Sequence, residues 1–257
     1  MGFLDKIFGK ADKPSGVVKA DNWNFYTYTY GEGQVAMIEF DVAAGSEDAH
    51  SGYNTCFRVI IYINPADCTE TGLPVKDEHE QLVKIEADLN KNISADCRFV
   101  ARSSYGALRE LIYQVNDAAT FKADYAQWAA RIQGYKLELR DSEGWKFFDE
   151  RIRPDFIYWQ QITDRRIIGT LLQNGSSPTS LHTLEHTILG DSAKLQSVAD
   201  QLSRDGFTVL SLDNNKLVLS KPMPLDGNTI SGLTMRLASY CNTLGLKYDG
   251  WGAAVVK

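Results

Sequence analysis

Cysteine is scarce in this sequence and forms no paired motif. The 257 residues include four cysteines (Cys56, Cys68, Cys97 and Cys241), and none stands in a C-x-x-C pair. A secreted scaffold held together by disulfides would be shorter and richer in cysteine. The apolar run within residues 1–13 is also too short for a secretory signal peptide. These two absences predict a cytoplasmic protein.

Long apolar runs and a surplus of positive charge are missing as well. No run approaches the roughly 18 apolar residues that span a bilayer, so we expect no membrane span. Lys and Arg number 27 against 33 Asp and Glu, a net charge of −6, whereas a general nucleic-acid binder needs a basic surplus. We therefore expect no direct binding of nucleic acid. The 44% of hydrophobic residues is typical of a globular chain with a sizeable core.

The familiar catalytic patterns are absent or misplaced. The sequence has no P-loop and no G-x-S-x-G elbow, and its many carboxylates cannot be assigned to a common cleft from sequence. Gly31, Gly33 and Ala36 match G-x-G-x-x-A in form, but a strand is predicted after them, where a dinucleotide site needs a helix. The sequence thus predicts no catalytic residue and no cofactor.

The first half reads as an antiparallel sheet with two helices on one face. About two domains are expected from the length. Alternating apolar residues, helical spacing and turn signals predict these elements in order: strands 22–30, 34–42 and 56–63, helix 77–92, a hairpin of 97–102 and 107–115 around the turn 103–106, helix 120–133 and strand 135–140. A connecting helix over 157–172 follows.

The second half has the order strand, helix, strand, strand, helix, strand. The predicted elements are strand 181–189, a helix capped by Asp191, strands 207–212 and 216–220, helix 229–244 and strand 247–256. This is the split β-α-β, ferredoxin-like order, with an antiparallel sheet and helices on one face. The predicted class is α+β, with a leader at 1–16, a first domain at 17–155, a connecting helix and loop at 156–180 and a second domain at 181–257. Phe3, Leu4, Ile7 and Phe8 would share one helical face in the leader.

One string matches a metal-site pattern in form. His182-Thr183-Leu184-Glu185-His186 spells H-x-x-E-H, a zinc-peptidase pattern when it lies on a helix. Its β-branched residues and flanking turns predict a strand instead. On a strand the two histidines stand roughly 13 Å apart, at about 3.3 Å per residue, so one ion could not bind both. The sequence predicts no metal site, and a strand with His182, Leu184, His186 and Ile188 on one face.

Two stretches of the last third resemble one known family. Residues 174–178 (Asn-Gly-Ser-Ser-Pro), leading into Leu184-Glu185-His186, resemble the opening of the bacterial regulator of ribonuclease E activity B. Residues 248–252 (Tyr-Asp-Gly-Trp-Gly) resemble that family's closing motif. The first half, from Trp23 to the stretch 145–154, resembles an uncharacterised bacterial domain family that implies no activity.

The resemblance implies a non-catalytic regulator that binds and inhibits a ribonuclease and thereby alters RNA decay. It makes Glu185, His186, Tyr248, Asp249 and Trp251 the residues expected to bind the protein partner. The net charge of this region departs from the family pattern, because members of the family resemble strongly acidic proteins. Residues 166–257 carry eight Lys and Arg against seven Asp and Glu, a net charge of +1, while the remainder carries −7.

Several alternatives stay open from the sequence. Asp249 and Gly250 fit a β-bulge as well as a recognition surface, and Glu185 and His186 fit internal hydrogen bonds as well as contacts. An enzyme or small-ligand module with a site between the domains, and an immunity-type inhibitor of another nuclease, are the other functions considered. The sequence leaves the oligomeric state undetermined.

Overall fold

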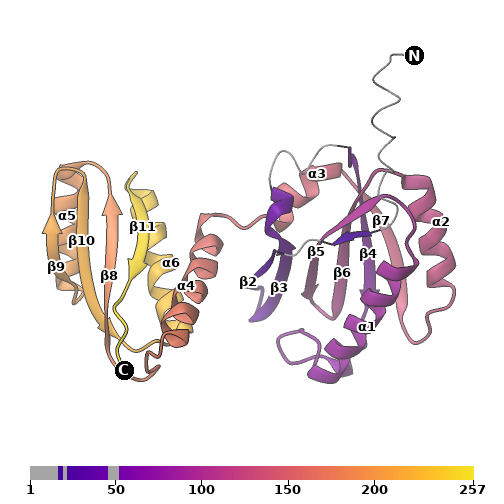
Figure 1. Ribbon diagram of the computed structural model, residues 1–257, viewed down its shortest axis with the longest axis horizontal. Helices are drawn as coiled ribbons and strands as arrows, with labels where there is room; N and C mark the ends of the chain where they lie inside the picture. The colour runs from indigo at the N-terminus through magenta and orange to yellow at the C-terminus, as the bar shows by residue number, and fades with distance from the viewer. Residues whose placement is uncertain (1–16, 20–21, 46–51) are drawn as a thin grey trace, which may run out of the picture. The chain divides into compact units, whose positions relative to one another are not determined.

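The computed structural model describes residues 17–19, 22–45 and 52–257 (Figure 1). The leader 1–16 predicted from the sequence, with its apolar face, lies outside these residues. The chain divides into two compact units, the first ending at Arg153 and the second spanning Pro154–Lys257. Both units mix helices with mainly antiparallel sheets, so the predicted α+β class with two domains is confirmed.

The first unit is built on a 7-stranded sheet in the order β2-β3-β5-β6-β4-β7, with β1 beside β5. All neighbours are antiparallel except β1 and β5. The strands are β1 Val17–Lys19, β2 Trp23–Tyr30, β3 Gln34–Asp41, β4 Thr55–Tyr62, β5 Cys97–Tyr105, β6 Leu108–Val115 and β7 Lys136–Ser142. The helices are α1 Lys76–Asn92, α2 Ala118–Ala129, the short α3 Gly144–Phe147 and the π-helical turn η5 Phe148–Ile152, with 3₁₀ turns η2 Val42–Gly45 and η4 Pro65–Asp67.

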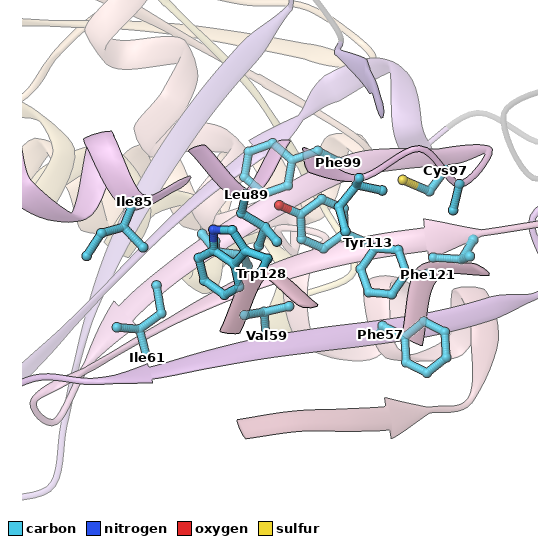
Figure 2. Packing of buried hydrophobic residues seen from close by; sticks show 14 of the residues in the cluster. Phe57, Val59, Ile61, Ile85, Leu89, Cys97, Phe99, Tyr113, Phe121 and Trp128 are labelled. Atoms are coloured by element: carbon cyan, nitrogen blue, oxygen red, sulfur yellow. The ribbon is translucent and has the colours of Figure 1, made fainter. Parts of the chain in front are cut away.

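The core of the first unit lies between one face of this sheet and the two helices α1 and α2. Figure 2 shows Phe57, Val59 and Ile61 of β4 on the same side as Leu89 of α1 and Trp128 of α2. The alternation of β4 explains this arrangement, because every second side chain of a strand points to the same face. Both helices therefore cover one face of the sheet, as the sequence predicts.

One turn differs from the sequence-based expectation. β5 continues through Tyr105, and the chain reverses at Gly106 and Ala107, both with positive φ (51° and 59°). The sequence predicts this turn over 103–106. Ser103 and Ser104 instead stay in the ladder, because their hydroxyls find partners across the hairpin in Glu110 and Arg109.

The second unit has a 4-stranded antiparallel sheet in the order β11-β8-β10-β9, visible in Figure 1. Its elements are α4 Phe156–Gln173, β8 His182–Leu189, α5 Ser192–Arg204, β9 Thr208–Leu212, β10 Lys216–Met223, α6 Gly227–Thr243 and β11 Lys247–Gly252. Counted from β8, the strands stand in the order 4-1-3-2, which is the split β-α-β arrangement. The ferredoxin-like prediction is confirmed.

Helix α4 is an addition to that plan and packs along α6. Its Ile168 and Leu171 join Leu184 of β8, Ile230 of α6 and Trp251 of β11 in one buried cluster. Asp155 begins the helix by accepting hydrogen bonds from the backbone N–H groups of residues 157 and 158. The segment that the sequence presents as a connector therefore completes the core of the second unit.

Candidate partner-binding surface

The five residues predicted to bind a partner lie together on two neighbouring strands of the second unit. In the antiparallel pairing of β8 and β11, His186 stands opposite Trp251 and Glu185 opposite Gly252. The two stretches that carry the resemblance are distant in sequence, and the sheet brings them side by side. The structure then separates the five residues between its two faces.

His186, Tyr248 and Trp251 face the helices. The ring of His186 is fully buried, and its Nδ1 lies 2.8 Å from the Tyr248 hydroxyl. Trp251 is 7% exposed, and its indole N–H donates to Asp164 Oδ1 at 2.7 Å. His186 and Trp251 are thus buried, and Tyr248 is partly buried against the core of the unit.

A β-bulge brings Tyr248 and Trp251 to the same face. Residues three apart on a regular strand point to opposite faces. Here the register shifts between Tyr248 and Gly250, leaving Asp249 as an extra residue without an opposite partner on β8. Gly250 takes φ 100°, a backbone conformation that suits glycine. The closing motif therefore contains a β-bulge at Asp249.

Burial makes His186 a weak base. Desolvation, with a smaller contribution from the Lys221 charge, lowers the pKa of His186 from 6.5 to about 4. The imidazole is therefore neutral at pH 7 and packs edge-on against Phe207, with ring centroids 5.6 Å apart. Burial also raises the pKa of Tyr248 well above its usual value, so this phenol keeps its proton.

Asp164 is the residue that sequence reasoning missed. It is fully buried on α4, and its carboxylate accepts from Trp251, from Thr234 Oγ1 at 2.5 Å and from Gln160 Nε2 at 2.8 Å. The bond from Thr234 joins α4 to α6, and the bond from Trp251 joins α4 to the closing motif on β11. A signal was present, because Asp164 precedes Ile168 and Leu171 by four and seven residues and so lies on the apolar stripe of the helix.

Glu185 and Asp249 face outward, on the side of the sheet opposite the helices. They line a shallow hollow of about 500 Å³ together with Thr187, Lys216, Val218 and residues 250–254, a stretch that includes Trp251. Asp249 is exposed and forms an ion pair with Lys247 at 2.6 Å, and such a pair on a surface adds little to stability. The open face thus combines two carboxylates with two lysines and a small apolar area.

The H-x-x-E-H string lies on strand β8, as predicted, with His182, Leu184, His186 and Ile188 buried on one face. His182 donates from Nδ1–H to the Ser180 carbonyl at 2.8 Å. Across the described ranges, no group of three or more His, Cys, Asp and Glu side chains has a geometry that could hold a metal ion.

None of the described helices is long and apolar enough to cross a bilayer.

Each of the two units matches the model of a known family. Residues 21–151, half of the chain, match the model of a family of unknown function, DUF695. The chain belongs to the DUF695 family. Residues 161–253 match the family "Regulator of ribonuclease activity B" (RraB), so this DUF695 protein carries an RraB domain within its second unit.

Curated relatives match the same end of the chain. "Regulator of ribonuclease activity B" of Photobacterium profundum is 29% identical over 111 residues, which cover 38% of this chain and 82% of that protein. The protein of the same name from Escherichia coli is 27% identical over 109 residues, 38% of this chain and 79% of that protein. The crystal structure of an unknown protein from Galdieria sulphuraria aligns with 79% of this chain at 12% identity, with a TM-score of 0.21.

Both halves of the predicted resemblance are confirmed by these matches. The RraB match begins at residue 161, within α4, and so includes Asp164. The relatives support a regulatory, RraB-like role for the second unit. For the first unit the comparison identifies the family, DUF695, and that family implies no activity.

Proposed function

We propose that this protein is a cytoplasmic, non-catalytic regulator whose RraB domain binds a ribonuclease, such as ribonuclease E, and inhibits or modulates its action on RNA. The observation that carries the proposal is the RraB match across most of a ferredoxin-like unit, together with relatives named as regulators of ribonuclease activity. The partner is a protein, and RNA is affected through it.

The contact surface in this proposal is the open face of the second sheet. The helices cover the other face, while Glu185 and Asp249 line a hollow that no helix covers within the described part of the unit. Two carboxylates on one face suit a basic segment of a partner, because complementary charge speeds association and selects the correct partner. His186, Tyr248 and Trp251 act indirectly, by holding the bulge that projects Asp249.

The experiment mixes the purified full-length protein with purified ribonuclease E and measures complex formation and the rate of RNA cleavage. We expect binding and slower cleavage. The double variant Glu185→Arg/Asp249→Arg should weaken binding by about tenfold or more, because it places positive charge where a basic segment docks. Asp200→Arg, an exposed charge reversal on α5, is the matched control and should leave binding unchanged.

Three results would contradict the proposal. One is the absence of a complex and of any change in cleavage at micromolar protein. A second is equal binding by the open-face variant and the Asp200→Arg control, which would move the contact elsewhere. The third is RNA binding by the isolated protein that accounts for all slowing of cleavage.

A further inference from the structure

The first unit has a cavity of its own, on the face of its sheet opposite α1 and α2. This cavity measures about 440 Å³. It is lined by side chains of β2 to β6 and of the α3–η5 segment: Tyr28, Ile38, Arg58, Ser103, Tyr105, Glu110, Phe147, Arg151 and Ile152. Its size lies within the range of about 300–1,000 Å³ typical of small-molecule sites.

The floor of the cavity is a buried polar cluster. Glu110 is 4% exposed and forms an ion pair with Arg58 at 3.1 Å, and Ser103 Oγ donates to its other oxygen at 3.4 Å. Burial and a hydrogen bond to Glu110 raise the pKa of Tyr105 to about 12, so this phenol stays protonated. The carboxylate of Glu110 is therefore fully engaged with the protein's own donors.

Arg58 is held in one position by its neighbours. Its Nε–H donates to Ser142 Oγ at 2.9 Å, and its guanidinium lies over the Phe147 ring at 4.6 Å. A guanidinium has five N–H donors, and the bonds to Ser142 and Glu110 use two of them. A fixed guanidinium with donors to spare is well suited to an oxyanion, because little entropy is lost when it binds.

Arg151 supplies a second cation at the exposed edge of the cavity. Within the described residues it forms no ion pair, in contrast to Arg153 two residues later, which is paired with Asp149 at 2.6 Å. Arg151 and Tyr28 both line the cavity. The lining side chains therefore carry one positive charge in excess, from Arg58 and Arg151 against Glu110.

Aromatic rings form the walls between these charges. Tyr28, Tyr105 and Phe147 line the space, and Ile38 and Ile152 supply an apolar backing. Tyr28 continues a row of tyrosines on β2, with ring centroids 6.4 Å from Tyr26 and 6.1 Å from Tyr30. Such walls favour a flat ring, since aromatic faces stack on one another.

We propose that this cavity is a binding site for a small molecule that carries both an oxyanion and a flat ring, such as a nucleoside monophosphate or an aromatic carboxylate. Arg58 and Arg151 bind the oxyanion, and Tyr28 and Phe147 hold the ring. The site belongs to the DUF695 part of the chain and does not depend on the ribonuclease proposal.

The test is calorimetric titration of the full-length protein with AMP, UMP, 4-hydroxybenzoate, inorganic phosphate and adenosine. We expect AMP and UMP, or 4-hydroxybenzoate, to bind at least about tenfold more tightly than phosphate or adenosine, which each lack one half of the ligand. Arg151→Gln should weaken that binding by about tenfold or more. Arg153→Gln, on the same exposed segment, is the matched control and should bind like the unchanged protein.

Protection of Arg151 provides a second readout that needs no variant. Phenylglyoxal modifies accessible arginines, and a bound probe should slow modification of Arg151 but leave Arg153 unaffected, as read by peptide mass spectrometry. Preference for the nucleotides or for the hydroxybenzoate identifies the source of the oxyanion, and either result supports the site. Binding by none of the ring-bearing anions, or equal binding by Arg151→Gln, overturns the proposal.

Discussion

At the scale of single residues, the closing motif acts from the inside of the second unit. Trp251 donates to a carboxylate that is itself completely buried, and a buried acceptor that loses a donor is costly. Trp251→Phe keeps the ring packing and removes the N–H. We expect it to lower the free energy of unfolding by about 1–3 kcal/mol, measured by urea denaturation.

A matched control for this substitution is Tyr240→Phe on α6, which also removes one polar hydrogen from a partly buried ring and keeps the packing of that ring. It should change stability by less than about 0.5 kcal/mol. Equal effects of the two substitutions would show that the bond to Asp164 contributes nothing to the stability of this unit.

His186 predicts a dependence of stability on pH. Its pKa in the folded protein is about 4, below the ordinary value of 6.5, so the unfolded chain binds the proton first as pH falls. The stability that the buried neutral imidazole contributes is therefore complete above pH 6.5 and is lost as pH falls toward 4. Over that window the loss is on the order of 3 kcal/mol.

His186→Asn keeps a polar atom near Tyr248 and cannot take up this proton. We expect the stability difference between the unchanged protein and this variant to shrink or reverse between about pH 6.5 and 4.5, measured by urea unfolding at fixed ionic strength. Parallel stability curves for the two proteins would show that His186 titrates normally in the folded state.

At the scale of elements, strand β11 depends on its bulge. Gly250 has φ 100°, and a Cβ there would meet no atom within 4 Å, so the cost of adding one is the backbone conformation alone. Gly250→Ala should therefore destabilise the protein by about 1–3 kcal/mol. If the proposed contact surface is right, it should also weaken ribonuclease binding, because the bulge projects Asp249.

Gly252→Ala serves as the comparison for Gly250→Ala, because Gly252 is on the same strand, has ordinary φ and also has open space around it. We expect it to be close to neutral in thermal unfolding. A loss at Gly252 as large as that at Gly250 would count against the conformational explanation.

At the scale of the whole molecule, the chain consists of two units, and the second one includes α4. The sequence-based limit of that domain, at 181, would leave α4 outside and separate Asp164 from Trp251. We predict that a fragment of residues 154–257 folds cooperatively, because the contacts of the unit lie within it. A fragment of residues 181–257 should be less stable by several kcal/mol, since it exposes Leu184, Ile230 and the Trp251 indole.

Urea unfolding of the two fragments, followed by circular dichroism, tests this prediction. Equal midpoints and equal cooperativity would mean that α4 is only a connector, as the sequence suggests. Unequal midpoints in the expected order would show that the domain begins before residue 181 and includes α4, in line with the RraB match that begins at residue 161.

The sequence by itself determined the classes of structure and their order. Alternation of apolar residues and helical spacing predict strands and helices because they record which side of each element is buried. The split β-α-β order of the second half, the strand at the H-x-x-E-H string and the two family resemblances all follow from that local information. Glycine and aspartate residues marked the ends of several elements, and these signals are local as well.

The tertiary structure alone decided what the motif residues do. Glu185 and His186 are neighbours in sequence, yet one faces the open surface and the other the core, and a single bulged residue brings Tyr248 and Trp251 to the same side. Asp164 and the cavity around Arg58 and Arg151 depend on elements that are distant along the chain. Such contacts arise from packing and register across a sheet, which no local pattern of residues records.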